Sequence, residues 1–309
     1  MQNLGYACIN MTLSGGSKKT RVTTNRSMIR RTFDKRGSDY AAELALQNLN
    51  DLTTILHWNS KNNINFFRIS SCVFPWASEY SISELHSYPL LVKSAELAGE
   101  TASNYGMRLT SHPGPFNKLC SPKESVVENT IRDLEIHGEL FDMLGLSRTP
   151  YNKINIHVGA AYDSKEIALD TFCKNFERLS DSVKSRLTVE NDDRKSLYST
   201  HELYEGIYKR IGIPIVFDYH HHKFRNDGES EEEALRLAAS TWGDITPVVH
   251  YSESMSEEKG DPTIKANAHS DYIYNYIDDY GLDIDIMIEA KAKELALLRY
   301  RKNFISSEG

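Results

Sequence analysis

Short apolar runs recur along the chain, and a longer helix-like stretch follows most of them. The runs lack strict alternation of apolar and polar side chains, as expected for parallel strands that are buried on both faces. We predict strands at residues 4–9, 65–70, 107–111, 153–156, 186–189, 214–217, 246–249 and 283–288. We predict helices at residues 40–58, 89–105, 123–144, 165–183, 200–211, 231–240, 270–280 and 289–303. Strands and helices in alternation indicate a parallel sheet.

Most of the predicted strands close on a residue that can bind a metal ion. These closing residues are His112, His157, Glu190, Asp218, His250 and Glu289. In a (β/α)8 barrel, the carboxyl ends of the strands form the active-site face. Imidazoles and carboxylates gathered there are ligands of Zn, Mn or Fe ions. We therefore predict an α/β protein with a single (β/α)8 TIM-type barrel over residues 1–309 and a metal site at the C-terminal strand ends.

Length and composition agree with one barrel. The chain has 309 residues, 40% of them hydrophobic, and a barrel takes about 250. No apolar stretch reaches about 18 residues, so we expect no transmembrane helix and no membrane partner. The amino terminus lacks a secretion-type signal, and the 4 cysteines form no CxxC pair. We expect an intracellular protein, in the cytoplasm or with the genome, that is not secreted.

Eight short pieces, spread from the first predicted strand to the last, carry a more specific signal. They are LGYACINMTL from Leu4, FRISS from Phe67, SHPG from Ser111, IHVG from Ile156, ENDD from Glu190, DYHH from Asp218, HSDY from His269 and EAKAKE from Glu289. In this order they resemble the UV damage endonuclease family, DNA-repair barrels related in architecture to endonuclease IV and the xylose isomerase-like barrels. Each piece is weak alone, and their joint order is what makes the resemblance specific.

The resemblance implies a metal-dependent endonuclease that hydrolyses the phosphodiester bond 5′ to UV photoproducts in double-stranded DNA. It implies two or three bound divalent ions, with Mn²⁺ as the expected metal and Zn or Mg as alternatives. The sequence gives no sign of an obligate protein partner. The implied ligands are Glu190, His112, His157, Asp218, His221, His250, His269 and Glu289. Glu190 ends a central strand, so we predict that it bridges two ions. We place Glu190, His112, His157 and Glu289 at the catalytic centre.

Two of these histidines have a competing interpretation. In the sequence His220-His221-His222, strand alternation would put His220 on the Asp218 side. The Asp-x-x-His spacing of the family favours His221 instead, which we choose. His269 could be an exposed residue near a helix start, and its place in the HSDY piece favours the ligand role.

Three positions depart from the family pattern. Glu79 stands where the family usually has a His, and we keep it as a candidate ligand. Val248 stands where the family often has a Lys, two residues before His250. Pro115 and Phe116 replace a Gln-Tyr pair that is implied to wedge into the duplex at the lesion. Phe116 can still unstack bases, whereas Pro115 cannot copy the hydrogen bonds of Gln.

Candidate DNA contacts lie in and after the first predicted strand. The chain has a net charge of −7, but segregated positive charge can still bind phosphates. A basic segment supplies Lys18, Lys19, Arg21, Arg30 and Arg31, and the alternative for it is a solvated loop. The resemblance also implies that Tyr6 and Asn10 face a flipped nucleotide, and the alternative is a core Tyr with a turn Asn.

Two other functions stay open at this stage. A sugar isomerase or epimerase of the same fold would use fewer metal ions and a small closed pocket, and would lack the basic segment. A catalytically inactive DNA-damage binding protein is the second alternative, because of the substitutions at Glu79, Val248 and Pro115.

Overall fold

The structure is a computed structural model that describes residues 3–17 and 20–305. In these residues eight parallel strands form a closed barrel, in which the first strand pairs with the last. The strands are β1 (Asn3–Ala7), β2 (Phe66–Ile69), β3 (Arg108–Ser111), β4 (Ile154–Ile156), β5 (Leu187–Glu190), β6 (Ile215–Asp218), β7 (Val248–Tyr251) and β8 (Asp285–Ile288). Each strand overlaps the run predicted for it, so the predicted TIM-type barrel is confirmed.

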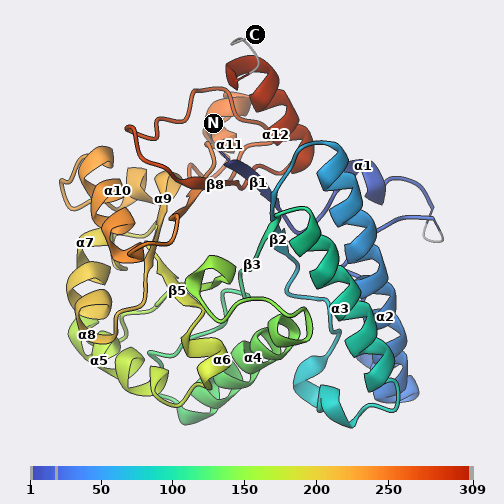
Figure 1. Cartoon of the computed structure of the whole chain (residues 1–309). Coiled ribbons are helices and arrows are strands. Elements are labelled where there is room, and N and C mark those ends of the chain that lie inside the picture. Colours follow the sequence, from blue (N-terminus) through green and yellow to red (C-terminus); the bar gives the residue numbers. More distant parts are fainter. Residues whose placement is uncertain (1–2, 18–19, 306–309) are drawn as a thin grey trace.

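Helices surround the strands on the outside of the barrel (Figure 1). The longer ones are α2 (Arg30–Lys61), α3 (Tyr88–Asn104), α4 (Glu124–Met143), α5 (Lys165–Phe176), α10 (Glu231–Ala239) and α12 (Glu294–Tyr300). The shorter ones are α1 (Met11–Ser14), α6 (Asp181–Lys184), α7 (Thr200–Leu203), α8 (Lys209–Ile211), α9 (Tyr219–Phe224) and α11 (Met255–Lys259). Single helical turns lie at Ala77–Glu79, Ile82–Glu84, Pro150–Asn152 and Ser240–Trp242, and π-helical turns at Tyr204–Tyr208 and Arg301–Ile305.

Several helices differ from their predicted bounds. The helix predicted at 289–303 begins at Glu294, and the helix predicted at 200–211 is divided into α7, a π-helical turn and α8. Helix α2 begins ten residues before the predicted start at 40, and it is kinked at Gly37, where φ is 67°. The predicted helix 165–183 is divided into α5 and α6. The Ser180 side chain accepts a hydrogen bond from the Val183 backbone and so starts a new helix.

The predicted helix at 270–280 is wrong, because this segment is irregular. Several of its backbone N–H groups donate to side chains of other elements and not to the preceding turn. The Glu253 carboxylate accepts hydrogen bonds from the N–H groups of Tyr274 at 3.2 Å and Asn275 at 2.9 Å. The N–H group of Ile277 donates to the Tyr300 hydroxyl at 3.1 Å. Tertiary bonds therefore override the helical pattern of the sequence.

The amino-terminal end of the barrel is closed by a buried ion pair. Arg108 begins β3 and Asp285 begins β8, and their side chains meet at 2.8 Å. The Arg108 guanidinium also donates to the Thr246 carbonyl at 2.8 Å, so this buried charge has several partners. This end is thus filled by bonded side chains, and the opposite end carries the candidate site.

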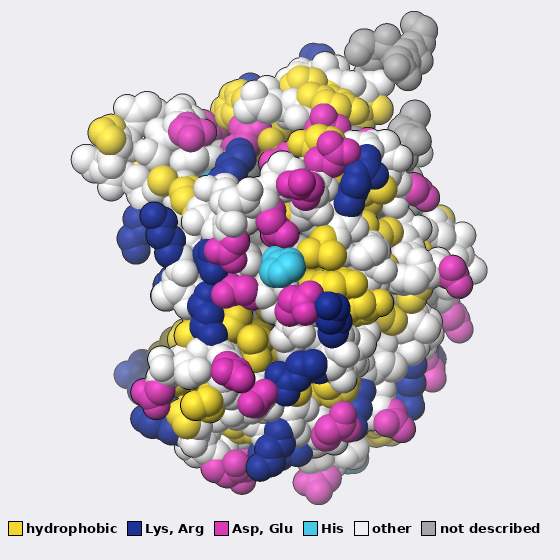
Figure 2. Space-filling view, turned by 90° about the vertical axis from the view of Figure 1, so that its left-hand side faces the viewer, with side chains coloured by type: hydrophobic (Ala, Val, Ile, Leu, Met, Phe, Trp, Pro, Cys, Tyr) yellow, Lys and Arg dark blue, Asp and Glu magenta, His cyan; other side chains and the backbone are white. Residues whose placement is uncertain are grey.

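The flank of the barrel formed by α5, α7, α8 and α10 has a mixed surface. Figure 2 shows acidic and basic side chains interspersed over this flank, without one large patch of either sign. Within the described residues, none of the helices combines the length and the apolar character needed to cross a bilayer.

Candidate metal centre

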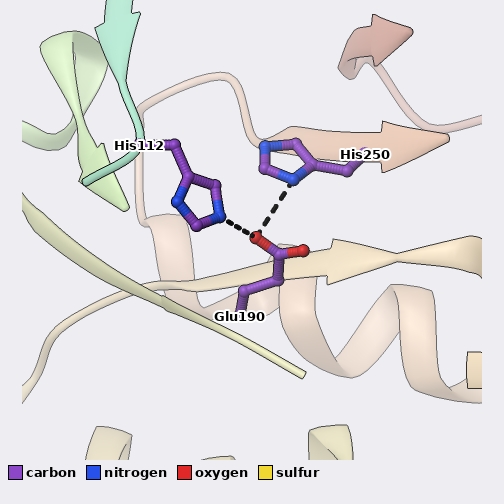
Figure 3. Close-up of side chains that lie close together, drawn as sticks. All are labelled: His112, Glu190 and His250. Carbon is purple, nitrogen blue, oxygen red and sulfur yellow. Dashed lines mark hydrogen bonds and ion pairs between the residues drawn. The ribbon is translucent and has the colours of Figure 1, made fainter. Parts of the chain in front are cut away.

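Glu190 lies at the middle of the candidate site. It is the last residue of β5, and its side chain is buried. One carboxylate oxygen, Oε2, lies 3.1 Å from His112 Nε2 and 3.1 Å from His250 Nδ1 (Figure 3). The other oxygen, Oε1, lies 3.3 Å from His221 Nδ1 and 3.7 Å from His157 Nε2. The two oxygens face different pairs of imidazoles, so Glu190 is shared between two groups of candidate ligands.

Three overlapping groups of ligand atoms are present in the described residues. In each group, the ligand atoms all lie within 4.8 Å of one another. The groups are His112 with Glu190 and His250, His157 with Glu190 and His221, and Asp218 with His250 and Glu289. The imidazole of His269 adjoins the third group, with Nδ1 3.8 Å from Glu289 Oε2. These clusters can hold divalent metal ions.

The hydrogen bonding of the ligand atoms fits bound ions. Asp218 Oδ2 is buried and forms no hydrogen bond among the described residues. A buried polar atom without a partner is costly, and an ion at the centre would satisfy it. The mixed nitrogen and oxygen donors suit Mn or Zn.

The start of α9 decides between neighbouring histidines. Strand β6 ends at Asp218, whose Oδ1 accepts a hydrogen bond from the His221 N–H group at 2.8 Å. This cap turns the chain into a helix, which brings His221 to Glu190. His220 points elsewhere and packs against the rings of Phe224 and His269. The structure therefore places His221 with the predicted ligands, as the family spacing implied.

The charges of the centre perturb its protonation. Burial alone would lower the pKa of His157, but the Glu190 and Asp192 carboxylates outweigh it and raise that pKa to about 9. Burial lowers the pKa of His250 to about 4. Burial would raise the pKa of Glu190, but the histidines around it hold that pKa well below its usual range. Without ions, the centre therefore contains an ionised carboxylate and a protonated His157.

Two buried cations beside the carboxylates were missed from the sequence. Lys153 Nζ lies 3.1 Å from His250 Nε2, and burial lowers the pKa of Lys153 to about 7. Arg68 on β2 forms an ion pair with Glu289. A lysine is thus present near His250 although Val248 lacks one. Strand alternation from His157 back to Lys153 places both inside the barrel, and this signal could have identified Lys153.

Polar neighbours hold the ligands in position. The Asn155 amide donates to Glu190, and Asn155 accepts a 2.7 Å hydrogen bond from the Thr188 hydroxyl. His112 Nδ1 pairs with the Pro113 carbonyl at 3.0 Å, which leaves Nε2 facing Glu190. Such partners fix the ring orientation and the tautomer of a metal-binding histidine.

Glu79, Tyr6 and Asn10 lie outside the three groups of candidate ligands. Glu79 pairs with Arg30 at 3.1 Å. The Tyr6 hydroxyl is buried, where it donates to Asn59 at 2.6 Å and accepts from Asn10 at 2.9 Å. The Asn10 side chain also accepts from the Leu13 N–H group and caps α1. This network favours the structural alternative for Tyr6 and Asn10.

The predicted DNA contacts differ in their exposure. Phe116 is 88% exposed, next to the exposed Pro115. Arg30 pairs with Asp34 at 2.8 Å as well as with Glu79. Arg31 is exposed and forms no ion pair within the described ranges. Arg21 is half-buried, and Lys18 and Lys19 lie outside the described residues.

Comparison with known proteins identifies the family. The family model described as UV-endonuclease UvdE matches residues 2–308. The chain belongs to the UvdE family. It is 37% identical over 318 residues to the UV-damage endonuclease of Schizosaccharomyces pombe, covering 97% of this chain and 50% of that protein. The chain thus spans half the length of this UvdE relative.

Solved structures agree with the UvdE assignment. The crystal structure of SacUVDE matches with a TM-score of 0.84 and 31% sequence identity, over 98% of this chain and 98% of that chain. A D-psicose 3-epimerase from Clostridium cellulolyticum H10 matches with a TM-score of 0.54 and 13% identity, over 77% and 78% of the two chains. The epimerase shares the fold alone, so the isomerase alternative has no support beyond the barrel.

Proposed function

We propose that this UvdE-family barrel is a metal-dependent DNA-repair endonuclease that hydrolyses the phosphodiester bond 5′ to UV photoproducts in duplex DNA. The observation that carries the proposal is the Glu190 carboxylate, whose two oxygens face two separate pairs of imidazoles. Family membership supports the choice of DNA as the substrate. The proposal assigns the activity to residues 1–309 as one domain.

The ligand residues would hold two or three divalent ions, with Mn²⁺ as the proposed metal and Zn or Mg as alternatives. Bound ions supply charge neutralisation on the phosphate and lower the pKa of water. Glu190 would be shared between the ions, and His112 and His157, which follow β3 and β4, would hold them with it. Asn155 and the Pro113 carbonyl keep Glu190 and His112 oriented during turnover.

Phe116 is the proposed contact with the lesion. Its side chain is almost fully exposed, four residues after His112. An exposed ring beside the site can fill the space left by an unstacked base pair. Tyr6 and Asn10 are bonded in the interior, so the proposal gives them the role of holding the start of α1.

Nicking of supercoiled plasmid tests the proposal. With Mn²⁺, the protein should nick UV-irradiated plasmid, leave untreated plasmid intact and lose activity in EDTA. A duplex with one defined photoproduct, end-labelled on the damaged strand, should be cut on its 5′ side. Binding of damaged DNA without any cutting would instead favour the inactive damage-binding alternative. Equal nicking of irradiated and untreated plasmid would contradict a lesion-directed function.

A further inference from the structure

A pocket of about 350 Å³ opens beside the metal centre. His112, His157 and His221 form one part of its lining. Lys118, on the loop after β3, and Arg194, on the loop after β5, form another part. The pocket therefore joins the candidate ligands to two cationic side chains that the proposed mechanism does not use.

The backbone around Lys118 is anchored on both sides. Its N–H group donates to the Thr130 hydroxyl at 2.9 Å. The Asn117 amide donates to Asp133 at 2.7 Å, and the Leu119 carbonyl accepts from Asn175 at 2.7 Å. The position of Lys118 is thus set by α4 and α5 and does not depend on the pocket.

A glycine makes room for the lysine ammonium group. Gly159 has φ of 67°, and a Cβ atom there would lie 2.1 Å from Lys118 Nζ. A larger residue would strain the backbone at this φ and would displace the ammonium group from its present position. The local structure therefore places this charge over the Gly159 backbone, at the wall of the pocket.

The two cations are free to bind an anion. Within the described part of the chain, neither Lys118 Nζ nor the Arg194 guanidinium forms a hydrogen bond or an ion pair. The two carboxylates of the pocket have hydrogen-bond or ion-pair partners of their own, although Asp192 also attracts the Lys118 ammonium group. Asp192 lies 3.3 Å from His157 Nδ1 and accepts from the Tyr198 N–H group. Asp193 accepts from the Asn267 amide.

We infer that Lys118 and Arg194 form a subsite for a DNA phosphate that neighbours the scissile one. The inference rests on the proposed function, because it takes DNA as the substrate. A half-buried ammonium group without a partner gains a strong, charge-assisted bond from a phosphate oxygen. The pocket volume lies at the lower end of the range for small-ligand sites, which suits a nucleotide-sized group. This contact would set the position of the strand relative to the metal ions.

A charge-deletion scan of the DNA tests this subsite. The probes are a duplex with one photoproduct and copies in which one phosphate at a time is a neutral methylphosphonate. Binding is measured with Ca²⁺ in place of Mn²⁺ for wild type, Lys118→Met and Lys195→Met. Lys195 is the matched control, since it is an exposed lysine beside Arg194 that does not line the pocket.

Wild type and the Lys195→Met control should bind about tenfold more weakly when one particular phosphate near the cleavage site is replaced by methylphosphonate. Lys118→Met should bind the unmodified duplex about tenfold more weakly than wild type does. Replacing that same phosphate by methylphosphonate should not lower the affinity of Lys118→Met any further. Its slope of log K against log salt should fall by about 0.9. Its circular-dichroism melting curve should match that of wild type.

Equal methylphosphonate penalties in wild type and Lys118→Met at every position would overturn the subsite. If wild type still nicks irradiated plasmid in that case, the proposed endonuclease function stands without it. If wild type neither binds nor nicks damaged DNA, both the subsite and the proposed function are wrong.

Discussion

At the scale of single residues, the position of Glu190 makes it the most sensitive side chain of the site. Its two oxygens serve two groups of ligands, so one substitution perturbs both. We expect Glu190→Gln to fold and to lose at least about a hundredfold in nicking rate, because even partners outside the ligand set alter metal sites by ten- to hundredfold. Bound metal, measured by elemental analysis, should fall as well.

Glu177→Gln is the matched control for this change. Glu177 is exposed and pairs with Lys184 at 2.9 Å, away from the centre. This variant should retain the nicking rate and metal content of wild type. Near-normal turnover of Glu190→Gln would show that the bridging role is wrong.

A second residue-scale prediction concerns protons. The pKa of His157 is about 9 in the metal-free chain, so this imidazole is protonated near pH 7.5. A metal ion binds the neutral ring, and its binding should therefore release a proton. Titration of the metal-free protein with Mn²⁺ in buffers of different ionisation enthalpy measures this release.

The release should diminish as the pH rises through about 9, because His157 is then already neutral. The His157→Ala variant should release fewer protons at pH 7.5. Proton-independent binding by wild type at that pH would contradict the assignment of His157 as a ligand.

The candidate ligands could be predicted from the sequence more readily than the side chains that lie beside them. Strand-end position was enough to select His112, Glu190 and Glu289 as members of one centre. Strand alternation could place Lys153 inside the barrel, but it could not show that Lys153 meets His250 or that Arg68 pairs with Glu289. Partners of this kind depend on which strands adjoin in the closed barrel.

At the scale of elements, the strands were predictable because buried parallel strands give continuous apolar runs. The segment 270–280 was not, since its backbone N–H groups bond to Glu253 and to the Tyr300 hydroxyl. Helix α9 was also missed, because its start depends on a cap by Asp218 rather than on periodicity. Elements that depend on a single side-chain bond are the ones that pattern alone does not reveal.

The loop after β3 leads to a prediction about lesion recognition. Phe116 is 88% exposed, so its removal should shift the melting temperature by no more than about 1 °C. We expect Phe116→Ala to lower affinity for lesion-containing duplex about tenfold, because one stacking contact is lost. Affinity for undamaged duplex should change much less, as measured by fluorescence anisotropy on both duplexes. An equal loss on the two would remove Phe116 from lesion recognition.

The first turn of α2 gives a prediction about phosphate binding. Arg31 is exposed without an ion pair in the described ranges, whereas Arg30 already has Asp34 and Glu79 as partners. We therefore expect Arg31→Gln to reduce the salt slope of DNA binding by about 0.9, and Arg30→Gln to reduce it less. Lys174→Gln, on the mixed-charge flank at α5, is the control and should leave the slope unchanged (Figure 2). Equal slopes for all four proteins would show that this segment does not touch the DNA backbone.

At the scale of the whole molecule, ions should stabilise a barrel that is already folded. The metal-free chain balances its buried carboxylates with Arg68 and with protonated His157. We expect a cooperative melting transition in EDTA, and a rise of about 5 °C when Mn²⁺ exceeds its dissociation constant about a hundredfold. Thermal melts with and without Mn²⁺ measure the difference, and Glu190→Gln should show a smaller rise. Loss of the cooperative transition in EDTA would contradict a metal-independent fold.

The cations beneath the centre also bear on which metal the protein carries. Arg68 pairs with Glu289, so the barrel holds a counter-charge of its own before any ion arrives, and Lys153, whose pKa is about 7, adds part of a second charge near neutral pH. Folding and metal loading then become separate events. A site of nitrogen and oxygen ligands binds the divalent first-row metals with affinities in a general order, in which Mn²⁺ binds more weakly than Zn²⁺. The metal supply of the host cell at the moment of loading would therefore decide which ion occupies the site, and the same chain made in two hosts would differ in its metal.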